Sequence, residues 1–144
     1  MEHYFDIIRK NGLKVTPLRK AIIKLFIDQD SHMTPEDTWF KLKSKFKRYG
    51  LPSVYRNLEN LADCGILARI QQFDNKKHYG LCTSGKDRHH HHIVCVSCGK
   101  VDTISECAIP DRKRIKGFRV IDHYLQVNGI CEDCSSIPKG FNSD

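Results

Sequence analysis

The chain has 144 residues, 7 of them cysteines, is 40% hydrophobic and carries a formal net charge of +7. This length allows one domain or two small ones, and with so modest an apolar content two lobes would need a metal or a partner chain for stability. No apolar run reaches the roughly 18 residues of a membrane span, and no apolar signal region is present, so we expect a cytoplasmic protein.

The positive charge is concentrated in the first half. Residues 1–80 carry 15 Lys and Arg against 9 Asp and Glu, whereas residues 81–144 carry 9 against 8. A basic half beside a near-neutral half points to a polyanionic partner such as nucleic acid, although a solvated basic surface has the same composition. The helix pattern of the first half distinguishes these two interpretations.

That half has the pattern of successive amphipathic helices. An apolar stripe over residues 4–8 is followed by Gly12 as a helix stop. Thr16-Pro17 and Thr34-Pro35 each combine a hydroxyl N-cap with proline at the first helical position, and Asp37 adds a capping-box pattern to the second of them. The buried face expected for this third helix consists of Trp39, Phe40, Leu42 and Phe46.

A fourth helix is predicted from Ser53, as its N-cap, to about Cys64, with an apolar stripe at helical spacing. Its polar side chains suit a major groove, because Arg and Asn can contact base edges in a bidentate manner and Tyr can contact thymine methyls or phosphate. Ordinary amphipathic helices with a solvated face often have the same pattern. The short turn after the third helix nevertheless favours a helix-turn-helix DNA-binding motif. The residues expected to contact DNA are Ser53, Tyr55, Arg56, Asn57 and Asn60.

Strand patterns begin after Gly65. Residues 66–73 and 77–82 predict a β-hairpin, a wing on which Lys76 and Lys77 can contact phosphate. Beyond a loop over 83–89 we expect short strands over 93–96 and 100–104, a short basic helix near 110–116, and a long strand over 118–127.

Two C-x-x-C pairs, Cys95/Cys98 and Cys131/Cys134, are separated by 32 residues. Each pair forms a knuckle that directs both sulfur atoms at one ion, and two knuckles complete a closed, structural four-thiolate zinc site. A thioredoxin-like redox pair would need only one such motif, in a βαβ context that the sequence lacks. Cys64 and Cys107 receive no metal role, and Cys64 is most simply a small core residue.

Four consecutive histidines, residues 89–92, precede the first pair. In an extended segment His90 and His92 face one side, and His89 and His91 the other, so the segment can serve two metal sites. Imidazole with carboxylate suits Fe²⁺, Mn²⁺ or Zn²⁺, whereas a thiolate favours zinc. A hydrogen-bonded surface role is preferred for His3 and His78. The residues considered for completing the two sites are His32, Cys82, Asp102, Glu106 and His123.

Taken together, these motifs resemble the ferric uptake regulator (Fur) superfamily over nearly the whole chain. The strongest pieces are Pro52-Ser53-Val54-Tyr55-Arg56-Asn57-Leu58 and His90-x-His92-x-x-Cys95-x-x-Cys98-Gly99-Lys100, with further similarity in residues 30–37 and 129–134. With the predicted elements, the resemblance implies an α+β fold. A winged helix-turn-helix DNA-binding domain over 1–82 and a hinge loop over 83–89 would precede a small α/β dimerisation and metal-binding domain over 90–144.

The resemblance implies a homodimeric repressor of metal-homeostasis or peroxide-stress genes that binds a palindromic, AT-rich operator. A regulatory Fe²⁺, Mn²⁺ or Zn²⁺ ion would favour its DNA-binding shape. By position, His32, His90 and His92 match regulatory ligands, with Asp102 or Cys82 as additions. The second site would comprise His89, His91 and His123 with Glu106, or with Asp111 in its place. Neither enzymatic activity nor a small-molecule substrate is expected.

Departures from the family pattern bear on the sensed metal. Iron- and peroxide-sensing members carry Asp or Glu directly after the aromatic residue of the last wing strand, where this chain has Gly80 after Tyr79. Tyr79-x-x-Cys82 before a histidine run is similar to the zinc-uptake regulators, but their further Asp ligand falls at Ala68. We expect iron- or manganese-dependent regulation, with a zinc-uptake regulator that uses Cys82 as the alternative.

Three other classes of protein match parts of this sequence. A constitutive DNA-binding protein with purely structural metals fits the helices and the knuckles but leaves the histidine cluster without a role. Residues 80–86 match the first seven positions of a phosphate-binding loop, but Asp87 stands where Ser or Thr is needed and no helix pattern follows. A zinc hydrolase is disfavoured because no H-E-x-x-H motif is present.

Overall fold

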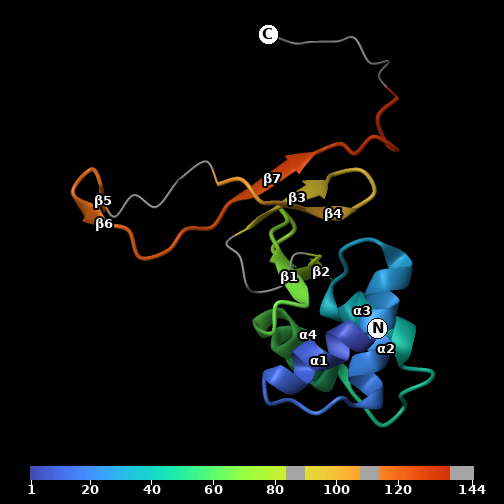
Figure 1. Ribbon diagram of the computed structural model, residues 1–144. Helices are drawn as coiled ribbons and strands as arrows, with labels where there is room; N and C mark the ends of the chain where they lie inside the picture. Colours follow the sequence, from blue (N-terminus) through green and yellow to red (C-terminus); the bar gives the residue numbers. More distant parts are fainter. Residues whose placement is uncertain (84–89, 108–113, 137–144) are drawn as a thin grey trace.

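The computed structural model describes residues 1–83, 90–107 and 114–136. Its N-terminal part consists of α1 (Glu2–Lys10), α2 (Pro17–Gln29), α3 (Pro35–Leu42) and α4 (Leu51–Asp63), followed by the antiparallel strands β1 (Leu67–Ile70) and β2 (His78–Leu81). Figure 1 shows the helices gathered at one end of the molecule, with β1 and β2 between them and the remaining strands. The predicted α+β fold with an N-terminal winged helix is confirmed.

The helices pack their apolar faces into one core. Two of the predicted helix starts are confirmed, because Thr16 Oγ1 accepts a hydrogen bond from the Arg19 amide and Thr34 forms a reciprocal capping box with Asp37. The largest fully buried apolar side chains of this core include Ile8, Ile22, Phe26, Leu58, Leu61, Ile66 and Tyr79.

Three local predictions in this part are wrong. Ser53 does not cap α4, because the helix begins at Leu51, where Pro52 in the first turn lacks an N–H that would need a partner. Phe40 is 66% exposed, since the short helix α3 buries Thr38 and Leu42 instead. The wing strands are also shorter than predicted, and residues 71–77 form the loop between them.

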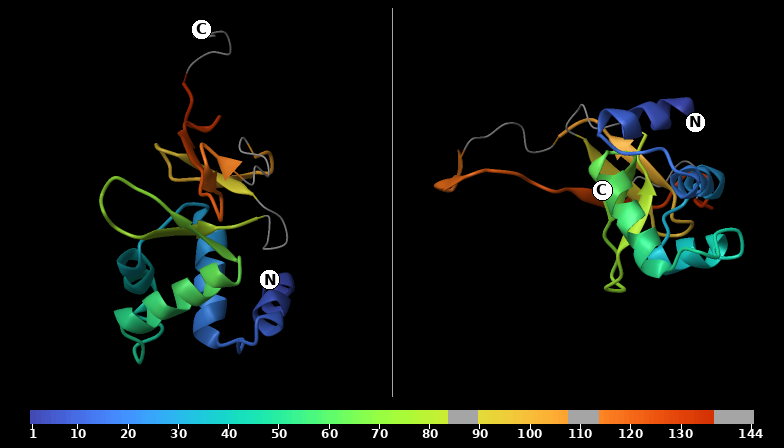
Figure 2. Two further views of the ribbon diagram at one scale, coloured as in Figure 1. Left: turned by 90° about the vertical axis from the view of Figure 1, so that its left-hand side faces the viewer. Right: turned by 90° about the horizontal axis from the view of Figure 1, so that it is seen from below.

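The C-terminal part is built on a three-stranded sheet with the order β4-β3-β7. Strand β3 (His91–Cys95) pairs antiparallel with β4 (Val101–Ile104) and parallel with β7 (Gln126–Gly129). The strands β5 (Arg114–Ile115) and β6 (Phe118–Arg119) form a small hairpin that stands away from the rest of the molecule (Figures 1 and 2).

Two predictions for this region are corrected. Arg114 and Ile115 lie in β5 rather than in the basic helix expected near 110–116, whose other residues up to 113 lie outside the described part. Lys116 and Gly117 both adopt positive φ, 48° and 84°, which closes a tight hairpin and prevents a helix there. The strand expected over 118–127 is divided into β6 and the first residues of β7.

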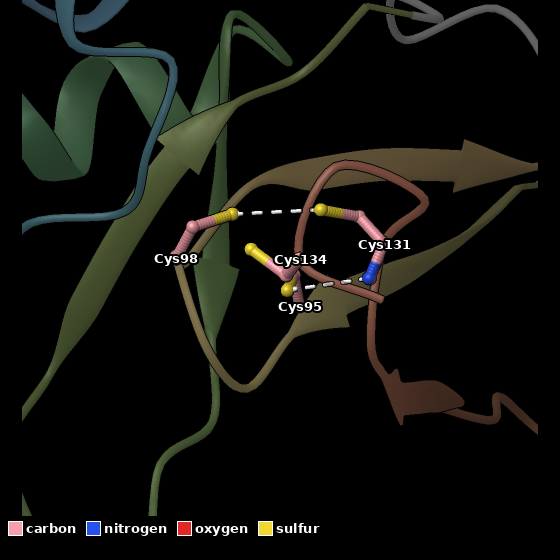
Figure 3. A group of neighbouring side chains, drawn as sticks. All are labelled: Cys95, Cys98, Cys131 and Cys134. Carbon is pink, nitrogen blue, oxygen red and sulfur yellow. Dashed lines mark hydrogen bonds between the residues drawn. The ribbon is translucent and has the colours of Figure 1, made fainter. Parts of the chain in front are cut away.

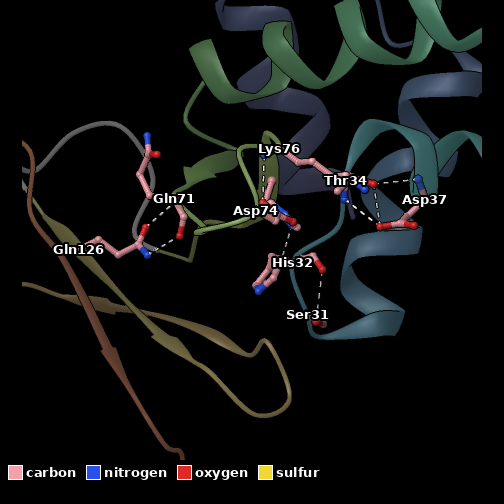
Figure 4. Close-up of polar contacts among 9 residues, drawn as sticks. Ser31, His32, Thr34, Asp37, Gln71, Asp74, Lys76 and Gln126 are labelled. Atoms are coloured by element: carbon pink, nitrogen blue, oxygen red, sulfur yellow. Dashed lines mark hydrogen bonds and ion pairs between the residues drawn. The ribbon is translucent and has the colours of Figure 1, made fainter.

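The two parts meet through a small apolar cluster and a few polar contacts. Ala68, Ile70 and Cys82 from the hairpin side pack with Val94 and Val101 from the sheet. The side-chain amide of Gln126 exchanges two hydrogen bonds with the backbone of Gln71, at 2.9 and 3.0 Å (Figure 4). Direct contact therefore couples the wing to the sheet. Within the described residues, no helix has the length and apolarity needed to cross a membrane.

Candidate metal centres and nucleic-acid interface

The four cysteines of the two C-x-x-C pairs converge on one point (Figure 3). Cys95 ends β3, Cys98 lies in the turn before β4, and Cys131 and Cys134 lie in the turn that follows β7. Their sulfur atoms all lie within 4.8 Å of one another, and Cys98 Sγ and Cys131 Sγ are 3.7 Å apart. A tetrahedral four-thiolate zinc site has sulfur–sulfur edges of about 3.8 Å, so this set of donors fits zinc.

The backbone around Cys95 favours its thiolate form. Each knuckle is closed by a backbone hydrogen bond, from Gly99 N to Cys95 O at 2.9 Å and from Cys134 N to Cys131 O at 3.1 Å. The amide of Cys131 donates to Cys95 Sγ at 3.4 Å, and such backbone donors, with that of Cys98, lower the pKa of the Cys95 thiol to about 6. The thiolate is the form that binds metal.

A second cluster contains Cys82, His90 and His92. Cys82 follows β2, whereas His90 immediately precedes β3 and His92 lies within it. Cys82 Sγ lies 3.2 Å from His90 Nε2, and the rings of His90 and His92 are 5.0 Å apart in an edge-to-face arrangement. These donors therefore lie on both sides of residues 84–89 in the sequence, a segment outside the described part. Their contact brings the end of the wing to the start of the sheet.

His92 is suited to receive a metal. Its Nε2 atom is buried and has no hydrogen-bond partner among the described residues. Burial, followed by the neighbouring His90 and His91, lowers the pKa of His92 to about 4, so the ring is neutral near pH 7. A buried imidazole nitrogen without a partner, beside a thiol and a second imidazole, fits a divalent transition metal.

Two other predicted regulatory ligands lie away from this cluster. His32 Nδ1 contacts His78 Nδ1 at 3.1 Å, and His78 Nε2 contacts Asp74 Oδ2 at 2.7 Å. Figure 4 shows His32 beside Asp74 and Ser31, and the His32 amide donates to the Gly99 carbonyl at 3.1 Å. Asp102 is exposed in β4, where its carboxylate accepts a hydrogen bond from the Thr103 amide. The structure thus groups Cys82, and neither His32 nor Asp102, with His90 and His92.

A third cluster contains His91, Cys107 and His123. His91 and His123 were predicted second-site residues, whereas Cys107 was not and Glu106, which is exposed, does not join them. His89 and Asp111 lie outside the described residues. The only signal for Cys107 in the sequence was that it, like Cys64, had no role once the two pairs and Cys82 had been considered as ligands.

Four of the residues predicted to contact DNA line one pocket beside α4, whereas Tyr55 lies beside Lys77 of the wing. Arg56 is exposed, and Ser53, Tyr55, Asn57 and Asn60 are half-buried. A shallow pocket between the N-terminus of α2 and α4 is lined by Thr16, Leu18, Arg19, Tyr49, Ser53, Arg56, Asn57 and Asn60. Two guanidinium groups and two side-chain amides on one concave surface suit phosphates and base edges.

A polar network holds α4 against the wing. The Glu59 carboxylate accepts hydrogen bonds from Tyr79 and from Arg69, the latter at 2.7 Å, and Arg69 also contacts Asp63. The hydrogen bond from Arg69 is the largest cause that lowers the pKa of Glu59. Lys77 Nζ lies 5.3 Å from the centre of the Tyr55 ring, so the wing lysine lies beside the helix, and Lys76 is exposed nearby.

Comparisons with known proteins agree with this architecture. The model of the Ferric uptake regulator family matches residues 10–128. The Ferric uptake regulation protein of Bacillus subtilis is 34% identical, covering 94% of this chain and 97% of its own. The Peroxide operon regulator of the same organism is 26% identical, with coverage of 94% and 93%.

A solved structure of a zinc uptake regulator complexed with zinc and DNA shares the fold, with a TM-score of 0.71 at 23% identity over 90% of this chain and 88% of that one. The family model spans most of the chain, and a curated relative exceeds 30% identity over nearly its full length. The chain therefore belongs to the Ferric uptake regulator family.

Proposed function

We propose that this protein is a metal-responsive transcriptional repressor of metal-homeostasis or peroxide-stress genes. The observation that carries the proposal is the cluster of Cys82, His90 and His92, whose donor atoms come from both ends of the segment between wing and sheet. The ferric uptake and peroxide regulators among its relatives support iron- or manganese-dependent regulation. We assign it no enzymatic activity and no small-molecule substrate.

The DNA-binding unit in this proposal is residues 1–82, with α4 as the reading helix and Lys76 and Lys77 on the wing. A hinge over 83–89 leads to a dimerisation domain over 90–144, and the homodimer binds a palindromic, AT-rich operator in the cytoplasm. Support for dimerisation comes from large apolar side chains that the described chain leaves uncovered beyond β5, among them Phe118, Ile121 and Tyr124, which are 77%, 85% and 59% exposed.

The mechanism follows from where the donors lie. A bound divalent ion would supply one common point of attachment for a thiolate and two imidazoles. Cys82 follows the last wing strand, whereas His90 immediately precedes β3 and His92 lies within it, so holding the three together would restrict the angle between the two parts. A ligand shifts such an equilibrium only by its differential affinity for the two shapes. In the favoured shape the two α4 helices of a dimer match successive major grooves.

Replacing His90 with Ala should abolish the metal-dependent part of DNA binding while leaving the zinc content unchanged. The expected result is that ferrous iron or manganese raises the affinity of the natural protein for its promoter DNA but not that of His90→Ala. Fluorescence anisotropy on chelator-treated protein that retains its four-cysteine zinc measures this. His3→Ala, which removes an exposed histidine of α1, is the matched control. A full metal response in His90→Ala would refute the proposal.

The thiol of Cys82 supports a second candidate function, a zinc-uptake regulator, because a sulfur ligand favours zinc over iron and manganese. In that case zinc alone should promote DNA binding, and Cys82→Ser should eliminate the response, whereas Cys64→Ser should not. Cys64 is also buried but lies in the helical core. If Cys82→Ser responds normally to iron or manganese, the zinc alternative is wrong.

The exposed Arg56 should contribute to sequence-specific binding. We expect Arg56→Ala to weaken operator binding by about 1–3 kcal/mol, roughly 5- to 150-fold, because a bidentate contact to a base edge would be lost. Lys24→Ala removes the same charge from an exposed site on α2 and controls for the general electrostatic effect. Competition with unrelated DNA is the measurement. An equal loss in both variants, or an equal loss on both DNAs, would contradict base readout by Arg56.

A further inference from the structure

The connection between α3 and α4 carries most of the excess positive charge of this protein. Residues 41–56 contain six Lys and Arg and no Asp or Glu, so they supply +6 of the formal net charge of +7. The five cations that precede Arg56 are all exposed, and we call them the basic strip: Lys41, Lys43, Lys45, Lys47 and Arg48. The rest of the chain is therefore balanced to within one charge.

The basic strip has no acidic partner in the described part of the chain. Each ion pair found there is made by a cation outside the strip. Like charges this close in the sequence repel one another, which destabilises the compact state. A polyanion that neutralises the strip would remove this repulsion, whereas a merely solvated surface would leave it in place.

Aromatic side chains hold the strip in position. Phe46 packs against the helical core. The Trp39 indole donates a hydrogen bond to the Tyr49 carbonyl at 3.3 Å, which ties the end of the connection to α3. Lys43 Nζ lies 4.3 Å from the centre of the exposed Phe40 ring, so a cation–π contact restrains this side chain. Less conformational freedom is then lost when the ammonium group binds a ligand.

The strip is continuous with the surface that is proposed to read DNA. Tyr49, which directly follows Arg48, lines the pocket that also contains Arg19 and Arg56. Figure 1 shows the connection at the end of the helical part that lies away from the strands β3, β4 and β7. In helix-turn-helix proteins the helix before the reading helix crosses the DNA backbone. Cations on the connection between these two helices would therefore lie beside phosphates when α4 enters a groove.

We propose that the basic strip binds DNA phosphates beside the groove that α4 enters, and that it supplies the largest share of the sequence-independent affinity for DNA. This inference rests on the proposed function, in which α4 reads the operator. It goes further, because none of the five side chains is among the residues that the sequence predicts to contact DNA. A cation that neutralises a phosphate releases counterions, and this contribution depends on salt but not on base sequence. The strip would strengthen binding to any DNA, while the pocket beside α4 would select the operator.

The salt dependence of DNA binding tests the strip directly. The variant Lys45→Gln/Lys47→Gln/Arg48→Gln replaces the three cations closest in sequence to α4 with uncharged polar side chains. The logarithm of its binding constant should fall less steeply with the logarithm of the salt concentration, by about 0.9 for each lost phosphate contact, or about 2.7 per bound protomer. Binding to promoter DNA and to unrelated DNA should weaken by the same factor, so the ratio of the two affinities should not change.

The matched control removes the same charge from the exposed β5–β6 hairpin, which stands away from the helices (Figures 1 and 2). This control, Arg114→Gln/Lys116→Gln/Arg119→Gln, should keep the salt dependence of the natural protein. Circular dichroism verifies that both variants are folded. An unchanged salt dependence in the strip variant, or an equal reduction in the strip variant and the control, overturns the proposal.

The same titrations separate this inference from the proposed function. Unrelated DNA is titrated with and without manganese, and the strip variant should show its reduced salt dependence in both conditions, because phosphate contacts need no regulatory metal. A natural protein whose DNA binding ignores metal would contradict the proposed function, while the reduced salt dependence would still support the strip. Binding to phosphatidylserine vesicles is measured in parallel. If the strip variant loses vesicle binding but keeps the natural salt dependence on DNA, the strip contacts a membrane surface and the proposal is wrong.

Discussion

Removing zinc from the four-cysteine cluster should unfold the sheet formed by β3, β4 and β7 while the helical core stays folded. The two knuckles connect the end of β3 to the turn after β7, and the described part of this region buries few large apolar side chains, chiefly Val94. Structural zinc contributes about 10–16 kcal/mol in zinc-finger peptides, which is comparable to the whole stability of a typical domain, about 5–15 kcal/mol.

Hydrogen exchange detected by mass spectrometry can measure this effect segment by segment. After chelation, and in Cys131→Ser, the amides of residues 91–95 and 126–129 should exchange at rates close to those of an unfolded chain. Those of α2 and α4 should remain protected, because their core contains none of the four zinc-binding cysteines. Cys64→Ser is the control, and metal analysis verifies the zinc content. Persisting protection of β3 in zinc-free protein would show that the sheet is stable by itself.

Replacing Gly80 with Asp should destabilise the protein strongly instead of creating an iron site. A Cβ atom at Gly80 would lie 2.8 Å from Val101 Cγ2 and 3.3 Å from Val101 Cβ, closer than the packing allows. Forced overpacking costs about 1–3 kcal/mol, and an unpaired carboxylate in this apolar cluster adds a further penalty. The acidic residue that the resemblance implies at this position in iron- and peroxide-sensing members has no room here, because Val101 of the sheet packs against Gly80 of the wing.

Urea denaturation of the zinc-loaded protein measures the decrease in the free energy of unfolding. Two further variants separate the causes of this decrease. Gly80→Ala should show the steric part alone, and combining it with Val101→Ala should cost less than the sum of the two single changes, because the pair is in contact. Gly50→Asp is the control, since a Cβ there would meet only Pro52 Cδ at 3.5 Å. A Gly80→Asp protein that is as stable as Gly50→Asp would contradict this packing argument.

Much of the fold could be predicted because its signals are local. Thr16-Pro17 and Thr34-Pro35 mark helix starts, since a cap requires only residues three positions apart. The spacing within each C-x-x-C pair predicted the two knuckles in the same way, and the structure brings their four sulfur atoms together. Local signals failed where two of them competed, as at the start of α4, where Pro52 outweighed Ser53.

The composition of the metal clusters depended on tertiary structure. The alternation of the histidine run separated His91 from His90 and His92, as the strand geometry requires. The sequence could not show that His32 lies beside His78 and Gly99, or that Cys107 rather than Glu106 completes the third cluster. Those partners are decided by how the wing, the knuckle and the segment before β7 pack against one another, and no short-range spacing encodes that packing.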